Sequence, residues 1–341
     1  MKRLLIDKVK QSIFVILVAL LGYSAIAQAD DTATLLVIKQ HLLRVYASGK
    51  LEKVFSAKEQ YSNLNISPNQ SYVVFDQKDD LWLLDVKTKR IERLTNVGKP
   101  YTSQYASISA RFRLWTLSSD KILYDVTPGD TDDPEGERPS VKVRSAKYGF
   151  YFYDLKTKIN RPIKLPKGSI LFWLKDGNFL IDNRDKIVLH DSIKKTERPL
   201  IFESNGGGGQ TSLSNDGNFI LTTILDKKWK TSQIIKADMS QGHVTNITPV
   251  GKFAEYQWAT FSPSGKRIVY GHRIGSVRGK DFAYLAVVNL VVDGRDVYRI
   301  VGNFDYNWID NSTIAITDRT EEVTILNVDT KQVMGNHKVR E

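Results

Sequence analysis

The chain has 341 residues, of which 41% are hydrophobic and 26% are charged. These shares are close to those of folded globular proteins, so they exclude wholesale disorder and a protein made mainly of membrane spans. There is no cysteine, which excludes disulfides, thiolate metal sites and cysteine nucleophiles. The formal net charge of +11 is spread along the chain and is not gathered in one arm or helix, which argues against a nucleic-acid partner.

The first 29 residues have the three parts of a secretory signal peptide. Met1–Gln11 is basic, Ser12–Leu21 is almost wholly apolar, and a run of small residues at alternate positions ends at Ala29. We predict cleavage after Ala29, with Ala27 as the second choice. A retained membrane anchor is the alternative, but the apolar run is shorter than the roughly 20 residues that cross a bilayer. The sequence therefore predicts that residues 30–341 form one domain in the bacterial periplasm or outside the cell.

A repeated phrase runs through the remainder of the chain. It consists of an apolar residue, a turn rich in Ser, Pro, Asp, Asn and Gly, and a short apolar strand. The copies begin at Ile66, Ile108, Trp173, Leu213, Phe261 and Trp308, and neighbouring copies are 40 to 65 residues apart. The copy at Ile108 is degenerate, because Ile108–Ala110 stands in the place of the turn before a predicted strand over Leu114–Leu117.

A second phrase follows, in which a hydrophobic strand ends in Asp or Asn and a Thr stands three residues later. Examples are Leu81–Thr88, Phe150–Thr157 and Val323–Thr330. Together the two phrases predict units of four antiparallel strands joined by tight turns, whose faces are buried only against neighbouring units. Ahead of the first full unit, residues 35–38, 42–46 and 51–55 predict the last three strands of a further unit.

This pattern predicts an all-β fold: a β-propeller of four-stranded blades, with seven blades favoured over six. A β-sandwich is the competing fold, but it gives no reason for one turn phrase to recur along the chain. Phe261–Tyr270 and Asp80–Thr88 resemble the WD40-like repeats of TolB-like propellers. The resemblance implies a periplasmic propeller that binds other proteins, and it implies no catalytic site. TolB has an α/β domain ahead of its propeller, and we expect none here because the strand signals begin close to the predicted leader.

The longest unit holds an acidic insertion over residues 127–139. Its carboxylates include four candidate ligands, Asp130, Asp132, Asp133 and Glu135. These oxygens would suit Ca²⁺, but their order differs from that of an EF-hand loop, so a solvated loop without an ion is favoured. We therefore predict no metal and no cofactor. The length of the insertion makes it the first candidate for contact with a partner, because binding residues concentrate on loops held by a rigid scaffold.

Two further loops are basic. One holds Lys228, Trp229 and Lys230, and the other holds Arg273, Arg278 and Lys280. Trp229 is expected to be exposed between its lysines, whereas the other tryptophans fall mostly inside predicted strands. Such clusters are commonly solvated turns. They also suit an acidic partner, so we assign both loops as candidate partner-binding segments.

No pattern indicates a catalytic centre. The chain has no Gly-x-Ser-x-Gly nucleophile elbow, and its five histidines lack metal-ligand spacing. The prediction is a monomeric, non-enzymatic scaffold that binds a protein or peptide in the bacterial envelope. Two alternatives stay open. One is a propeller enzyme of the lactonase, lyase or glycosidase type with acids at the channel mouth, and the other is a carbohydrate-binding module with exposed coplanar aromatic rings.

Overall fold

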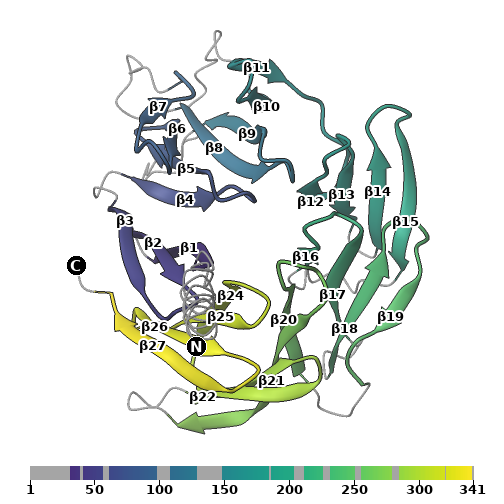
Figure 1. Cartoon of the computed structure of the whole chain (residues 1–341). Helices are drawn as coiled ribbons and strands as arrows, with labels where there is room; N and C mark the ends of the chain where they lie inside the picture. The colour runs from purple at the N-terminus through teal and green to yellow at the C-terminus, as the bar shows by residue number, and fades with distance from the viewer. Residues whose placement is uncertain are drawn as a thin grey trace, which may run out of the picture.

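A computed structural model describes residues 31–38, 41–56, 61–97, 108–128, 148–183, 186–202, 211–225, 231–249, 255–278, 284–318 and 320–339. In these ranges the regular secondary structure is entirely β-strand, and the strands form seven antiparallel sheets. The sheets stand around a central axis like the blades of a propeller (Figure 1). The prediction of an all-β propeller with seven blades is confirmed. The predicted signal peptide, residues 1–29, lies outside the described residues.

Blade 1 has three strands and blades 2 to 7 have four each, ordered along the chain. The strands of the first four blades are β1 (Ala33–Ile38), β2 (His41–Tyr46) and β3 (Leu51–Ser56); β4 (Ser62–Ile66), β5 (Tyr72–Gln77), β6 (Asp80–Asp85) and β7 (Ile91–Arg93); β8 (Ile108–Trp115), β9 (Lys121–Pro128), β10 (Gly149–Asp154) and β11 (Ile159–Pro162); and β12 (Ser169–Trp173), β13 (Phe179–Asp182), β14 (Lys186–Asp191) and β15 (Thr196–Phe202).

The last three blades follow the same order. Their strands are β16 (Ser212–Leu213), β17 (Phe219–Leu225), β18 (Ser232–Asp238) and β19 (Val244–Asn246); β20 (Glu255–Phe261), β21 (Ile268–Arg278), β22 (Tyr284–Val292) and β23 (Arg295–Val301); and β24 (Phe304–Trp308), β25 (Thr313–Asp318), β26 (Glu322–Asn327) and β27 (Gln332–Lys338). The part of the chain that the structure describes contains no helix long and apolar enough to span a membrane.

The repeated phrase forms the turn between the first and second strands of a blade. In four blades the turn begins with Ser or Thr, whose hydroxyl accepts a hydrogen bond from the amide five residues later. The pairs are Ser67 with Tyr72 (3.0 Å), Thr116 with Lys121 (3.0 Å), Ser214 with Phe219 (2.9 Å) and Ser262 with Arg267 (3.2 Å). The fourth turn residue has a positive φ, 79° at Gly217 and 71° at Gly265, which explains why glycine recurs there.

The prediction for the second copy of the phrase, at Ile108, is wrong. Ile108–Ala110 is not a turn but the start of β8, which continues to Trp115. The turn of this blade begins at Thr116, whose hydroxyl donates a hydrogen bond of 2.7 Å to Asp120 Oδ1. Thr and Asp replace the usual Ser-Pro and Asp-Gly pairs here, so the hydrogen bonding is kept although the phrase is lost.

The second phrase forms the turn between the third and fourth strands. The Asp85 carboxylate accepts the Thr88 amide at 2.8 Å, and Asp154 accepts the Thr157 amide at 2.9 Å. Asn327 does the same for Thr330 at 3.0 Å without carrying a charge. The backbone amides lower the pKa of the Asp85 and Asp154 carboxyls, because they stabilise the ionised form.

These aspartate turns predict that acid weakens the fold. An unfolded aspartate titrates near pH ~3.9, and the folded pKa lies lower at both positions. The stabilisation is therefore complete above about pH 5 and is lost as the pH falls below about 4. We expect equal urea midpoints at pH 7 and 5 and a lower midpoint at pH 3.5. The double variant Asp85→Asn/Asp154→Asn keeps both acceptors, so it should lose less; a wild-type midpoint constant down to pH 3 would contradict this account.

The hydrophobic core lies between the blades. The described residues contain seven buried apolar clusters, and each joins two adjacent sheets. Successive residues of a strand face opposite neighbours: Leu35 packs towards blade 2, and Leu36 packs towards blade 7. Both faces of a blade are thus covered, which explains why its middle strands are nearly continuous hydrophobic runs.

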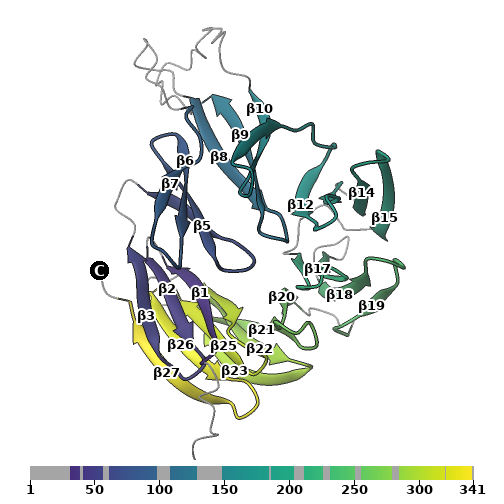
Figure 2. The same cartoon turned by 45° about the horizontal axis from the view of Figure 1, so that its top comes forward.

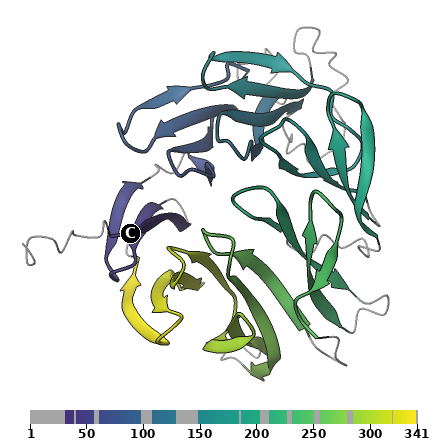
Figure 3. The same ribbon diagram turned by 45° about the vertical axis from the view of Figure 1, so that its right-hand side comes forward.

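The ring closes where blade 7 meets blade 1 (Figures 2 and 3). Among the described strands none is shared between these two blades, so closure depends on packing face to face. The buried cluster at this seam includes Leu36, Leu43 and Ile325. At its edge the backbones of Gly49 and Gly335 approach closely, and the His337 ring nitrogen Nε2 lies 2.6 Å from Gly49 O.

Candidate partner-binding face

The two ends of the ring differ in their connections. At one end, which we call the turn face, the two repeated phrases connect strands within each blade. At the other end, the hairpin face, the second strand of each blade turns into the third. The connections of blades 3, 5 and 6 are long on the hairpin face, over residues 129–148, 226–231 and 279–283. In blades 1 and 2 only residues 39–40 and 78–79 make this connection.

The predicted contact segments lie at the hairpin face, but the prediction of a loop over Arg273 and Arg278 is wrong, because β21 continues to Arg278 and only residues 279–283 connect it to β22. The residues that lie outside the described ranges are Asp130, Asp132, Asp133, Glu135, Lys228, Trp229, Lys230 and Lys280. Their flanking strands are described, and these strands bring the three connections to one end of the ring. Arg273 and Arg278 lie in β21, so these two assigned residues are the ones whose surroundings can be described.

The hairpin formed by the second and third strands of blade 6 is long. The strands β21 and β22 have 11 and 9 residues, and they pair as far as Arg278 opposite Tyr284. Every β21 residue from Arg273 onward is exposed. Arg273 forms an ion pair of 2.9 Å with Glu255 on the neighbouring strand β20. Since both partners are exposed, the pair orients the guanidinium and adds little to stability.

Four exposed apolar side chains accompany these arginines: Ile274, Val277, Leu285 and Val301, which we call the blade 6 patch. Val277 and Leu285 are directly opposite in the register, and Val301 is opposite Val287. Alternation along β22 places Leu285 and Val287 on one face, so Val277, Leu285 and Val301 share that face. They are 42%, 38% and 51% exposed. By the same alternation Arg273, opposite Val288, and Arg278, opposite Tyr284, lie on the other face of the hairpin. The patch is therefore an apolar surface, and the two arginines stand on the reverse face of the same hairpin.

A second exposed apolar pair stands at the blade 3 insertion. Tyr148 and Phe150 lie at and just before the start of β10, where the chain returns from residues 129–147. Sequence reasoning assigned the acidic residues of the insertion and missed these aromatic side chains. The alternation Tyr148-x-Phe150 before a strand was the available signal. It did not distinguish an exposed strand end from a buried one.

Asp76 and Asp125 lie near the hairpin-face ends of the second strands of blades 2 and 3, and each contacts a different polar side chain. Burial raises the pKa of Asp76, and Asn63 donates to its carboxylate at 2.7 Å. Asp125 is buried and pairs with the Arg113 guanidinium through contacts of 2.9 and 2.6 Å. Across the described ranges, no group of three or more His, Asp or Glu side chains is placed to hold a metal ion.

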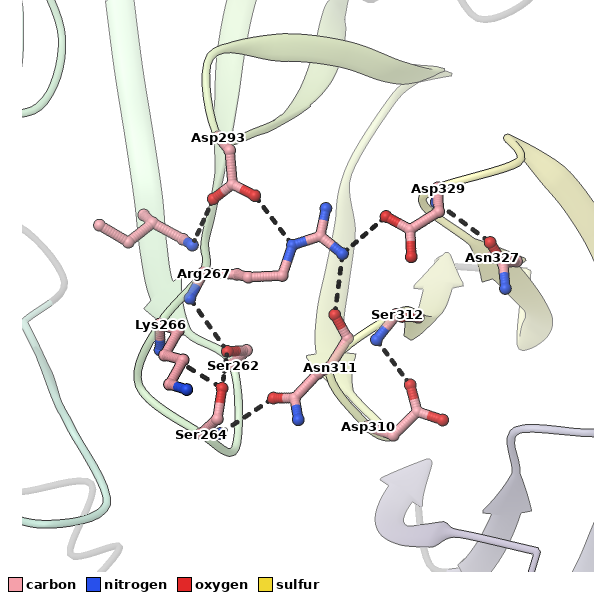
Figure 4. Close-up of polar contacts among 11 residues, drawn as sticks. Ser262, Ser264, Lys266, Arg267, Asp293, Asp310, Asn311, Ser312, Asn327 and Asp329 are labelled. Atoms are coloured by element: carbon pink, nitrogen blue, oxygen red, sulfur yellow. Dashed lines mark hydrogen bonds and ion pairs between the residues drawn. The ribbon is translucent and has the colours of Figure 1, made fainter. Parts of the chain in front are cut away.

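On the turn face, Arg267 clamps blade 6 to blade 7 (Figure 4). Its Nε lies 2.8 Å from Asp293, and its Nη1 lies 2.7 Å from Asp329 and 3.0 Å from the carbonyl oxygen of Asn311. The Ser312 hydroxyl and Arg267 lower the pKa of the Asp329 carboxyl. The guanidinium is thus occupied by two carboxylates and a carbonyl, which makes it a structural clamp and leaves it little capacity for a ligand.

The comparisons with known proteins find no matching family model and no matching curated protein. Solved structures do match. TolB from Acinetobacter baumannii is 17% identical with a TM-score of 0.46, over 78% of this chain and 62% of that chain. A putative TolB from Agrobacterium tumefaciens is 18% identical with a TM-score of 0.41, over 74% of this chain and 86% of that chain. A structure from an analysis of two prolyl endopeptidases is 15% identical with a TM-score of 0.51, over 89% of this chain and 49% of that chain.

These likenesses concern the fold. TolB structures are among the matches, as the repeated phrases predicted. The chain spans 62% of the Acinetobacter protein and about half of the endopeptidase chain, at 49%.

Proposed function

We propose that this protein is a non-enzymatic propeller scaffold that is exported to the bacterial envelope and binds a protein or peptide through its hairpin face. The observation that carries the proposal is the blade 6 patch. Val277, Leu285 and Val301 share one exposed face of a sheet, and Arg273 and Arg278 lie on the other face of the same hairpin. Apolar side chains that cluster on an exposed face commonly mark a surface that binds another protein.

The mechanism is rigid presentation. Seven sheets packed face to face hold the long connections of blades 3, 5 and 6 at one end of the ring. The described strands β21, β22 and β23 are held in one hydrogen-bonded sheet, so the blade 6 patch loses little conformational entropy when a partner binds. The formal net charge of +11 favours an acidic partner and speeds its approach, because opposite charges steer diffusional encounter.

Export is supported by the predicted leader. Its basic head, apolar run and small residues before Ala29 are the features that secretion requires. Removal of the leader leaves a domain that begins just before β1 (Ala33–Ile38), so the proposal places the whole propeller on the far side of the inner membrane.

Crosslinking in the envelope tests the proposal. The double variant Val277→Asp/Leu285→Asp places two charges in the centre of the patch, so we expect it to recover at least tenfold less of the partner than the wild type. Ile193→Asp is the matched control, because Ile193 is 87% exposed on the turn face and should not affect recovery. Thermal unfolding of all three proteins checks that the fold is unchanged.

Two outcomes would contradict the proposal. One is equal recovery of the partner by the wild type and the double variant. The other is recovery of no protein at all, with saccharide retained in its place, which would favour a carbohydrate-binding module.

A further inference from the structure

Blade 1 lacks the innermost strand that the other six blades have among the described residues. Residues 39–40 join β1 to β2, just as residues 78–79 join the second and third strands of blade 2. The turn from β2 to β3 has a positive φ of 93° at Gly49, where the equivalent turn of blade 2 has 60° at Lys89. The strands β1, β2 and β3 therefore correspond to the second, third and fourth strands of a blade, as the sequence predicted.

The inner edge of β1 pairs with no other described strand, and a strand added there would replace the Gln70 side chain at the Leu35 amide. The Ala47 amide donates to Thr32 O at 2.9 Å, so in the alternating antiparallel ladder Ala33, Leu35 and Val37 direct their amides and carbonyls away from β2. The Gln70 side chain accepts the Leu35 amide at 2.8 Å. Within the described ranges, the backbone groups of Ala33 and Val37 on this edge have no hydrogen-bond partner.

The surroundings of this edge define what would fit. On one side Leu36 and Ile38 belong to the cluster shared with blade 7, and on the other Leu35 and Val37 pack towards blade 2. The innermost strand of blade 7 shows the matching pattern. In β24 the aromatic residues Phe304, Tyr306 and Trp308 are buried and the polar residues between them are exposed. An extended segment with apolar residues at alternate positions has the same chemistry.

We propose that a segment of this kind, supplied by the partner protein, adds to β1 as the innermost strand of blade 1. This inference rests on the proposed function, including removal of the leader after Ala29. Only Asp30, Asp31 and Thr32 then precede β1. The turns between first and second strands elsewhere take four to six residues, so the cleaved chain cannot fold back here as its own first strand.

The position of the edge agrees with the partner-binding face. The strand β1 ends at Ile38, directly before the hairpin to β2, so its open edge reaches the hairpin face. A partner held on that face can insert an extended segment along β1. Main-chain hydrogen bonds would then give affinity, and the alternate side chains would give specificity.

The test uses the protein that begins at Asp30 and a fluorescent peptide, Gly-Asn-Phe-Asp-Tyr-Asn-Trp-Ile, which copies residues 302–309. We expect saturable binding by fluorescence anisotropy and slower hydrogen exchange at the Val37 amide. Val37→Pro removes an edge amide that does not pair with β2, so it should weaken binding about tenfold. Val37→Thr keeps the amide and should bind like the wild type.

A peptide of the same composition without the alternation serves as the second control and should not bind. Equal binding by this peptide, equal binding to Val37→Pro, or an unchanged exchange rate at Val37 would each overturn the inference, as would the absence of binding at 1 mM peptide. Hydrogen exchange on the wild type needs no variant, so it decides the question even if Val37→Pro does not fold. If the peptide fails while the patch variant still loses the partner, the proposed function stands without strand addition.

Discussion

Replacing Gly335 with Ala is expected to lower the free energy of unfolding by about 3 kcal/mol. Gly335 lies in β27 of blade 7, and an added Cβ would lie 2.5 Å from the carbonyl oxygen of Gly49 in blade 1. The obstacle is backbone and not the end of a flexible side chain, so the methyl group can be accommodated only by moving the two blades apart. The seam cluster around Leu36 and Ile325 would then be exposed to water.

Urea unfolding followed by tryptophan fluorescence measures this effect. Gly275→Ala is the matched control, because a Cβ at Gly275 would meet no atom within 4 Å and the backbone there does not require glycine. We expect the control to change the free energy by less than about 0.5 kcal/mol. If both variants were equally stable, the close approach of Gly49 and Gly335 would not be a feature of the protein in solution.

Asp80→Asn is expected to cost about 3 kcal/mol of stability. Asp80 is 2% exposed and accepts hydrogen bonds from the Thr95 hydroxyl at 2.8 Å and the Val97 amide at 2.7 Å. It also pairs with Arg93. An Asn at this position has one acceptor oxygen in place of two and brings an NH₂ group towards donors. A buried donor on the β6–β7 side of blade 2 would therefore lose its partner.

Asp329 provides a control for the effect of burial, because its ion pair with Arg267 is exposed. Asp329→Asn removes one carboxylate from the Arg267 clamp, where the aspartate is half exposed. The remaining groups can bind water, so we expect a loss below about 1 kcal/mol. Equal losses for Asp80→Asn and Asp329→Asn in urea titrations would show that burial does not set the strength of these carboxylate contacts.

Most of the fold could be predicted from the sequence because its turns use side-chain chemistry. The hydroxyl of Ser67, Ser214 or Ser262 accepts an amide of its own turn, and the Asp85 and Asp154 carboxylates act in the same way. Such contacts join residues that are close in the sequence, so they produce a motif that can be recognised from the sequence alone. The copy at Ile108 failed because Thr116 and Asp120 make the same turn with different residues. The sequence motif is lost in this blade, although the hydrogen bonds of the turn are kept.

The candidate site was only partly predictable. The basic segment around Arg273 and Arg278 stood out by its charge, and the insertion after β9 stood out by its length. The blade 6 patch did not, because Val277, Leu285 and Val301 come from three strands and looked like ordinary core residues. Their exposure accompanies the unusual length of β21 and β22, which have 11 and 9 residues. The open edge of β1 likewise became visible only when the pairing partners of every strand were known.

The seam between blades 1 and 7 has a mechanical consequence. No hydrogen-bonded ladder crosses it among the described strands, whereas every sheet is held together internally by such ladders. A force that pulls the two ends of the domain apart would therefore separate blade 1 from blade 7 before it broke the hydrogen bonds within either sheet. The ring is thus closed by a hydrophobic contact between blades 1 and 7, and a strand added along β1 would lie next to that contact.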